Sequence, residues 1–257
     1  TLWGDNGAEC SPFAVLPTLC RWAELCYAGD AEQLAPMFER CVGRSLTEFL
    51  ALDQPVLTPD NPSPGRMEVN ATKTLLYEDV LTPLFSHTLD MQAYAEHFAR
   101  CETALAESAD IADEWQPLFR SNAALCRALA MKCRVQAVLR QAWAQKDRVR
   151  LQALCRHELP ELRRALEDFA AAFERLWLSE NKPAGMDIFD LRIGGQLKRA
   201  DTAEQRISDW LDGSISTVEE LDEPLLPFDP EVEAQGHHES PARFWHELVS
   251  PINIAQI

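Results

Sequence analysis

Two short segments carry the residue types best suited to binding chemistry. The first is Trp3-Gly4-Asp5-Asn6-Gly7-Ala8-Glu9, where an indole stands two residues before a carboxylate. A sugar ring can stack its C–H face on an indole while carboxylates accept hydrogen bonds from its hydroxyls, so Trp3, Asp5 and Glu9 are candidate sugar-binding residues. The alternative for the same residues is a strand-to-helix turn whose acidic side chains stabilise the start of the helix.

The second segment begins at Glu180-Asn181-Lys182-Pro183-Ala184-Gly185-Met186-Asp187 and continues to Gly194-Gly195. Asp187 and Arg192 offer opposite charges at close spacing and are weaker binding candidates. Adjacent glycines inside a helical pattern cost about 1 kcal/mol each relative to alanine, and they usually mark a close approach of another element. The alternative is a tight contact between helices that carries a surface ion pair.

No catalytic residue and no metal or cofactor site is predicted from spacing. No Ser-His-Asp or Cys-His arrangement is recognisable, and His237-His238 lies in an acidic tail without a third ligand nearby. The eight cysteines form no Cys-x-x-Cys pair, which argues against a zinc knuckle or a thioredoxin-like site. We interpret most of them as small apolar residues in a reducing compartment, and we expect a cytoplasmic location.

Composition excludes two classes of partner. Across 257 residues the chain has 24 Lys and Arg against 41 Asp and Glu, a formal net charge of −17. Such a chain lacks the clustered cations that bind nucleic acid, and anionic lipid surfaces would repel it. No apolar run is long enough for a membrane span. Since Thr1 is not a start Met and no signal peptide follows it, we expect the sequence to begin inside a longer protein.

The elements that must position these residues are predicted to be almost all helical. Ser11-Pro12 and Ser45 are typical helix starts, and Pro160 should kink or restart its helix. Only residues 1–5 are a strand candidate. Apolar residues recur at steps of three and four along 124–142 and 151–176, as in the seams of a helical bundle. The expected helices span 12–27, 31–42, 46–53, 72–81, 89–108, 112–146, 148–180 and 189–212.

Both segments resemble parts of one known family. The first, with Phe13, Leu16-Pro17 and Ala23-Glu24, resembles the last barrel strand and helix of glycoside hydrolase family 20. The second resembles a signature of the helical C-terminal domain that some bacterial β-N-acetylhexosaminidases carry; the matching residues are Trp177, Glu180-Asn181-Lys182-Pro183, Gly185 and Asp190-Leu191-Arg192-Ile193-Gly194-Gly195.

The resemblance implies a mainly α fold: a bundle-like C-terminal domain preceded by the last β/α unit of a (β/α)8 barrel. The expected parts are 1–53 (that barrel unit and following helices), 54–70 (a Pro-rich loop), 71–222 (the helical domain) and 223–257 (an acidic tail that docks back).

The resemblance also implies a retaining hydrolase that removes terminal β-linked GlcNAc or GalNAc from an N-acetylhexosamine-containing glycan. In that family the 2-acetamido group of the substrate is the nucleophile, assisted by an Asp-Glu pair. Asp113-Glu114 and Asp222-Glu223 lack the context of this pair, so we expect it outside this sequence, in an N-terminal catalytic barrel. Trp3 would wall the sugar pocket and Asp5 would bind hydroxyls, although Glu is more usual at the position of Asp5. The isolated chain should be inactive.

A non-catalytic interaction or dimerisation module remains the alternative function. The two long seams motivate it, because they could pair between chains as well as within one. A homodimer is therefore an open expectation.

Overall fold

The computed structural model describes residues 11–27, 33–61, 71–83, 86 and 89–224. Within these ranges all regular secondary structure is helical, which confirms the mainly α class for this part of the chain. The strand expected at residues 1–5 and the tail beyond residue 224 lie outside the described residues. None of the helices described is both long enough and apolar enough to cross a membrane.

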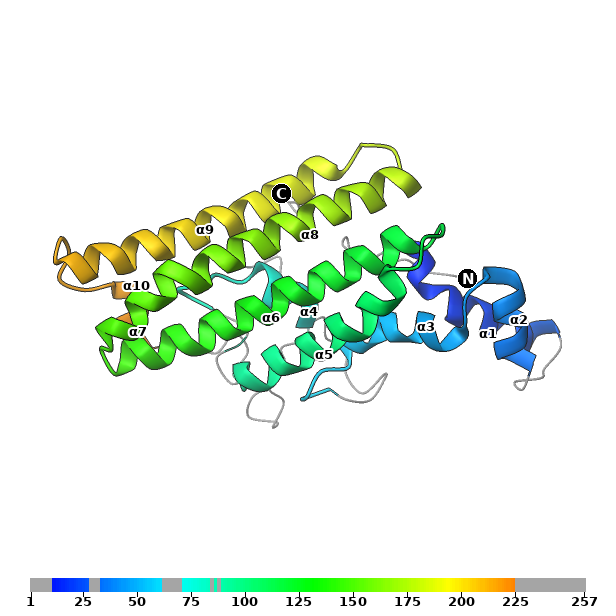
Figure 1. Cartoon of the computed structure of the whole chain (residues 1–257), viewed down its shortest axis with the longest axis horizontal. Helices are drawn as coiled ribbons and strands as arrows, with labels where there is room; N and C mark the ends of the chain where they lie inside the picture. The colour runs from blue at the N-terminus through cyan, green and yellow to red at the C-terminus, as the bar shows by residue number, and fades with distance from the viewer. Residues whose placement is uncertain (1–10, 28–32, 62–70, 84–85, 87–88, 225–257) are drawn as a thin grey trace.

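Four long helices lie side by side and form the body of the molecule (Figure 1). Helices α5 (Met91–Ala109) and α6 (Gln116–Ala144) make an antiparallel hairpin. Helix α8 (Leu159–Glu180) packs on α6, and α9 (Met186–Asp212) packs on α8. The short helix α4 (Ala71–Tyr77) lies against α6 and α9. This bundle agrees with the periodicity of the sequence.

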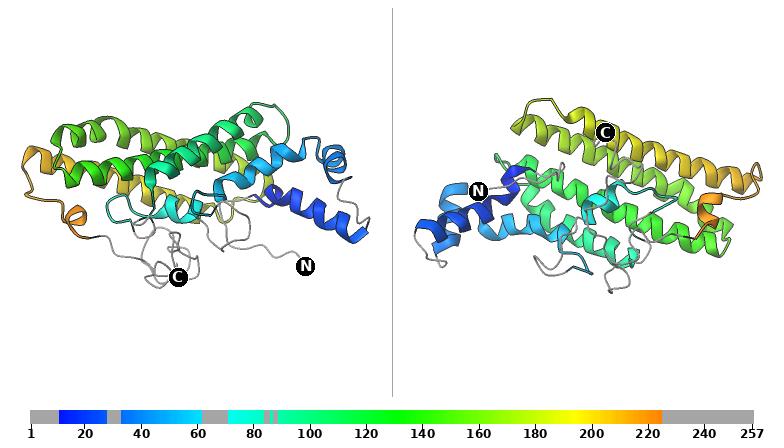
Figure 2. Two further views of the ribbon diagram at one scale, coloured as in Figure 1. Left: turned by 90° about the horizontal axis from the view of Figure 1, so that it is seen from below. Right: turned by 180° about the vertical axis from the view of Figure 1, so that it is seen from behind.

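The N-terminal helices form a smaller unit at one end of the bundle (Figure 2). It consists of η1 (Pro12–Val15), α1 (Leu16–Tyr27), α2 (Leu34–Val42), α3 (Leu46–Leu50) and η3 (Ala51–Val56). The Ser45 hydroxyl accepts from the Glu48 amide while the Glu48 carboxylate accepts from the Ser45 amide, which is a complete capping box. The helix expected to end at Asp53 instead tightens into η3 and continues to Val56.

A π-helical turn accommodates Pro160. Helix α7 (Arg148–Ala153) runs into the π turn η4 (Leu154–Glu158), and α8 follows directly. The Leu159 amide donates to the Leu154 carbonyl, five residues back, so the backbone widens just before the residue that has no amide donor. In place of a break at Pro160, the helix therefore continues through one wide π turn.

Two apolar cores stabilise the fold. The larger core lies between helices α4, α5, α6, α8 and α9. The smaller core lies between α2, α3 and the loop end of the α5–α6 hairpin. Both seams read from the sequence are used here, since residues such as Val135, Leu139, Leu162 and Phe169 are buried between helices of the same chain. The apolar seams that motivated a dimerisation module are therefore largely buried within one chain.

Three local details differ from expectation. Helix α9 begins at Met186, three residues before the expected start, because Gly185 takes a left-handed conformation with φ +98° and ends the preceding turn. Gly194 is exposed and a Cβ there would meet nothing within 4 Å, so the close approach expected of it is wrong. A short helix, α10 (Glu219–Asp222), was not expected.

Candidate functional site

The structure places the candidate residues of the sequence in different settings. Trp3, Asp5 and Glu9 lie outside the described residues. Asp187 is exposed in the first turn of α9, whereas Arg192, five residues further along the helix, is buried with its guanidinium carbon 5.5 Å from the centre of the Tyr77 ring. Arg192 thus packs into the bundle rather than onto its surface. The roles of all five residues in sugar binding stay predictions.

A polar contact joins the regions around the two sequence segments. The Ser11 hydroxyl donates to both oxygens of the Glu180 carboxylate, at 2.9 and 2.7 Å. Ser11 is buried at the start of η1, and Glu180 is the last residue of α8. Burial raises the pKa of the Glu180 carboxyl, and the Ser11 hydrogen bond opposes that rise. Residues 169 positions apart in sequence are therefore brought together at one end of the bundle.

The turn after Glu180 is built around the Trp177 indole. Its N–H donates to the Lys182 carbonyl at 2.8 Å, and its ring packs on Phe173. A Cβ at position 185 would lie only 3.2 Å from Cζ2 of Trp177, so both the φ angle and the available space at Gly185 require glycine. The spacing between Trp177 and Gly185 thus has a structural role: it fixes the turn from α8 to α9.

Helix α1 presents a second apolar face that the described part of the chain leaves open. Trp22 and Leu25, one turn apart on α1, are 59% and 58% exposed. Other α1 residues pack toward the smaller core, including Leu16 and Cys20. A helix with apolar residues on two sides is typical of one that packs between two layers, and α1 lies with the other N-terminal helices at one end of the bundle (Figure 2).

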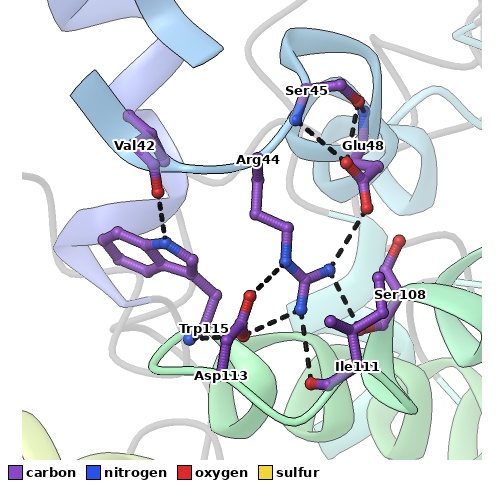
Figure 3. Close-up of polar contacts among 8 residues, drawn as sticks. All are labelled: Val42, Arg44, Ser45, Glu48, Ser108, Ile111, Asp113 and Trp115. Carbon is purple, nitrogen blue, oxygen red and sulfur yellow. Dashed lines mark hydrogen bonds and ion pairs between the residues drawn. The ribbon is translucent and has the colours of Figure 1, made fainter. Parts of the chain in front are cut away.

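Arg44 clamps the N-terminal unit to the α5–α6 loop (Figure 3). Its guanidinium donates to both oxygens of Asp113, at 2.5 and 2.8 Å, and to the Glu48 carboxylate at 3.2 Å. It also donates to the Ser108 carbonyl at 3.0 Å and the Ile111 carbonyl at 3.4 Å. These five hydrogen bonds compensate the burial of an arginine whose side chain is 3% exposed.

The indole of Trp115 continues this clamp. Its N–H donates to the Val42 carbonyl at 2.8 Å, beside the turn that carries Arg44 (Figure 3). The Arg44 hydrogen bond is the main cause that lowers the pKa of Asp113. Asp113, whose sequence context did not match that of a catalytic Asp-Glu pair, thus takes part in a structural ion pair with Arg44.

A second buried polar network lies inside the bundle, around Lys132. The Lys132 ammonium, fully buried in α6, donates to the Leu76 carbonyl and to Oε1 of Gln196, both at 2.7 Å, and to the Glu78 carbonyl. The Gln196 amide donates to the Tyr77 carbonyl at 2.7 Å. Side chains of α6 and α9 thereby satisfy three successive carbonyls at the end of α4, which that short helix cannot pair itself.

These arrangements are structural rather than catalytic. Among the described residues, no group of three or more His, Cys, Asp and Glu side chains is placed to hold a metal ion. The sequence signals identified the α8–α9 turn and the Ser45 cap but missed Arg44 and Lys132. The signal that could have pointed to Lys132 is its position on the apolar seam of α6, four residues after Ala128 and three before Val135.

Comparison with known families decides the affiliation. Residues 47–240 match the family described as Glycoside Hydrolase 20C C-terminal domain. The chain belongs to this family. A search of curated proteins gave no match. In this glycoside hydrolase 20C C-terminal domain the matched region starts within α3 and covers the whole described bundle, including the Trp177–Gly185 turn, while the segment with Trp3 and Asp5 precedes the match.

Proposed function

We propose that the chain is the helical C-terminal part of a retaining exo-β-N-acetylhexosaminidase. The observation that carries the proposal is the match of residues 47–240 to the glycoside hydrolase 20C C-terminal domain. The substrate would be a glycan ending in β-linked GlcNAc or GalNAc. The 2-acetamido group would attack the anomeric carbon, and an Asp-Glu pair outside this chain would orient that group and act as general acid and base.

The contribution of this chain would be to complete and support the sugar pocket. Trp3 would stack on the sugar ring and Asp5 would accept from its hydroxyls, with Glu9 as a second acid. The Ser11–Glu180 contact supports this assignment, because it fixes Ser11, two residues after Glu9, to the end of α8. Asp187, exposed at the same end of α9, is the weaker candidate.

The partner would be the N-terminal catalytic barrel of the same protein. The open apolar face of α1 supports this docking, since the resemblance makes α1 the last helix of a barrel and such a helix covers a strand with one face. The remaining face would pack, as observed, on α2 and α3. A reducing, cytoplasmic setting is part of the proposal, and the seven described cysteines, all free, are in keeping with it.

The experiment compares the chain with the complete enzyme on a chromogenic β-GlcNAc substrate. The chain alone is expected to show no turnover, and the complete enzyme to be active. Asp5→Ala in the complete enzyme should raise KM and lower kcat/KM by about tenfold to a hundredfold, the effect of losing one charged hydrogen-bond acceptor. Asp168→Ala, which removes an exposed acid of α8, is the matched control. Turnover by the chain alone, or unchanged kinetics in D5A, would contradict the proposal.

A non-catalytic interaction module is the second candidate, and one observation keeps it in view. The open face of α1 could pair with a second copy of the chain instead of a barrel. Light scattering separates the two: a concentration-dependent dimer that Trp22→Ser abolishes would favour self-association, whereas a monomer that is inactive alone would favour the barrel.

A further inference from the structure

Two cysteines and a histidine meet inside the α5–α6 hairpin. His97 and Cys101 lie one turn apart on α5, and the Cys101 sulfur is 3.6 Å from Nε2 of His97. Cys126 lies on α6 and belongs to the same apolar core as Cys101. None of the three takes part in the proposed sugar chemistry.

The register of the hairpin places the two cysteines opposite each other. Cys101 precedes the end of α5 at Ala109 by eight residues, and Cys126 follows the start of α6 at Gln116 by ten. At about 1.5 Å rise per residue these positions stand at nearly the same height above the connecting loop. The two thiols share a hydrogen bond, which agrees with this register.

The surroundings favour a negative charge on one sulfur only. The hydrogen bond from Cys126, together with His97 and Arg100, lowers the pKa of Cys101 to about 5 against the opposing effect of burial. The pKa of Cys126 is raised by the same hydrogen bond, by burial, and by the charges of Cys101 and Glu102. Cys101 is therefore the thiolate and Cys126 the thiol of the pair.

We propose that Cys101 and Cys126 form a redox-active dithiol, in which Cys101 reacts with a peroxide and Cys126 resolves the product. The Cys101 thiolate attacks one oxygen of hydrogen peroxide, and the O–O bond breaks. The departing hydroxide takes a proton and leaves as water, so Cys101 becomes a sulfenic acid. The Cys126 sulfur then displaces a second water and forms the disulfide. In sum, two thiols and one peroxide give one disulfide and two waters.

His97 would hold the attacking sulfur in its reactive state. An N–H at Nε2 donates to the thiolate, and the one-turn spacing on α5 keeps the two side chains together. The order of the two sulfurs also follows from access, since Cys101 is 5% exposed while Cys126 is fully buried. Oxidation would covalently link the two helices that support the N-terminal unit.

Cys133 provides an internal comparison. It is also buried in α6, but burial raises the pKa of its thiol well above the ordinary value. Cys155, within the π turn, has its pKa shifted in the same direction, to about 11, mainly by burial. The reactive pair is thus distinguished from other buried cysteines by the histidine and by the facing thiol.

The test treats the whole chain with hydrogen peroxide and maps its peptides by mass spectrometry without reduction. The expected product is a peptide pair crosslinked through Cys101 and Cys126, with Cys133 still reduced. Cys126→Ser should stop the reaction at a Cys101 sulfenic acid that dimedone traps. A chain in which peroxide oxidises the exposed Cys26 and Cys41 while Cys101 stays reduced would overturn the proposal.

A second measurement needs no variant. The alkylation rate of Cys101 by iodoacetamide should change less than about twofold between pH 6.5 and 8.5, where a free cysteine thiol gains more than about tenfold in thiolate. His97→Leu should restore a steep dependence on pH if the variant keeps its helical circular dichroism. A wild-type profile as steep as that of N-acetylcysteine would refute the proposal even if H97L fails to fold.

Discussion

At the scale of single residues, the bundle depends on charged groups that are buried with their partners. Lys132 is fully buried and donates to two backbone carbonyls and a glutamine side chain. Burial lowers the pKa of its ammonium to about 8, because the charged form loses its hydration. The contribution of Lys132 to the free energy of unfolding therefore increases as pH rises through the folded-state pKa.

Replacing Lys132 by Met tests both effects. At pH 7 the free energy of unfolding should fall by about 3 kcal/mol, because three acceptors lose their donor. In the wild type, the unfolded chain holds the lysine proton up to its ordinary pKa, while the fold releases it near pH 8. Stability attributable to Lys132 thus rises with pH, and the gap between wild type and K132M should widen by about 2 kcal/mol from pH 7 to 9.5.

Urea unfolding at the two pH values measures this gap. Lys198→Met, on an exposed position of α9, is the control and should change stability by less than about 0.5 kcal/mol at either pH. A gap that narrows at the higher pH would show that Lys132 keeps its proton in the fold.

Gly185 gives a second prediction at the same scale. Gly185→Ala should destabilise the chain by about 2 kcal/mol, through its positive φ and through a Cβ that crowds Trp177. Gly213→Ala is the matched control, because Gly213 has a similar φ of +88° but open space around it, so about 1 kcal/mol is expected. Thermal unfolding compares the two. Equal losses would mean that the contact with Trp177 carries no weight.

At the scale of elements, the Arg44 clamp is what fastens the N-terminal unit to the bundle. Arg44→Met should lower the free energy of unfolding by roughly 3 kcal/mol, because Asp113 loses its two guanidinium hydrogen bonds and the Ser108 and Ile111 carbonyls lose one each. Since the pKa of Asp113 is lower in the fold than in the unfolded chain, its share of stability is present above about pH 4 and is lost as pH falls below that value.

Denaturant titrations at pH 7 and pH 3 check both statements. The difference between wild type and R44M should shrink at pH 3, because the unfolded chain takes up a proton on Asp113 below its ordinary pKa and the stabilisation by the ionised carboxylate is then lost progressively. Arg127→Met is the control for an exposed pair with Asp168 and should cost less than about 0.5 kcal/mol. An R44M variant as stable as the wild type would mean that the smaller core alone holds the N-terminal unit in place.

Elements were predictable from sequence where their causes are local. Ser45 with Glu48 and the seams of α6 and α8 all act within a few residues, and each marks a helix that the structure contains. The π turn before Pro160 and the early start of α9 after Gly185 were not predictable in detail. The sequence indicates a break at each place, but it does not determine which backbone conformation forms the break.

Contacts between distant residues were not predictable. The burial of Lys132 depends on carbonyls 54 and 56 residues away in the sequence. The position of Ser11 depends on a carboxylate 169 residues away. Of the candidate site, the sequence identified the α8–α9 turn through its Trp and Gly, while the Ser11–Glu180 contact at its edge came only from the fold.

At the scale of the whole molecule, apolar surface is left at one end. The bundle buries its own seams, yet Trp22 and Leu25 are more than half exposed on α1, which lies with the other N-terminal helices at one end of the bundle (Figure 2). In a chain with a formal net charge of −17, such a face is the part of the surface best suited to a neighbouring domain.

The double change Trp22→Ser with Leu25→Ser tests that face. Because neither side chain contributes much buried area, the free energy of unfolding of the chain should change by less than about 0.5 kcal/mol. In the complete enzyme proposed above, the same change should release the helical part to limited proteolysis and reduce kcat/KM, because the proposed docking of α1 on a barrel would be weaker. Val149→Ser is the control, an exposed apolar residue on α7 at the other end of the bundle (Figure 1). If Val149→Ser had the same effect in the complete enzyme, the effect would come from general surface properties and not from the face of α1. If the double variant of the chain itself unfolded at much lower urea, its exposed residues would act through the core of the chain. Either result would contradict α1 as the docking face.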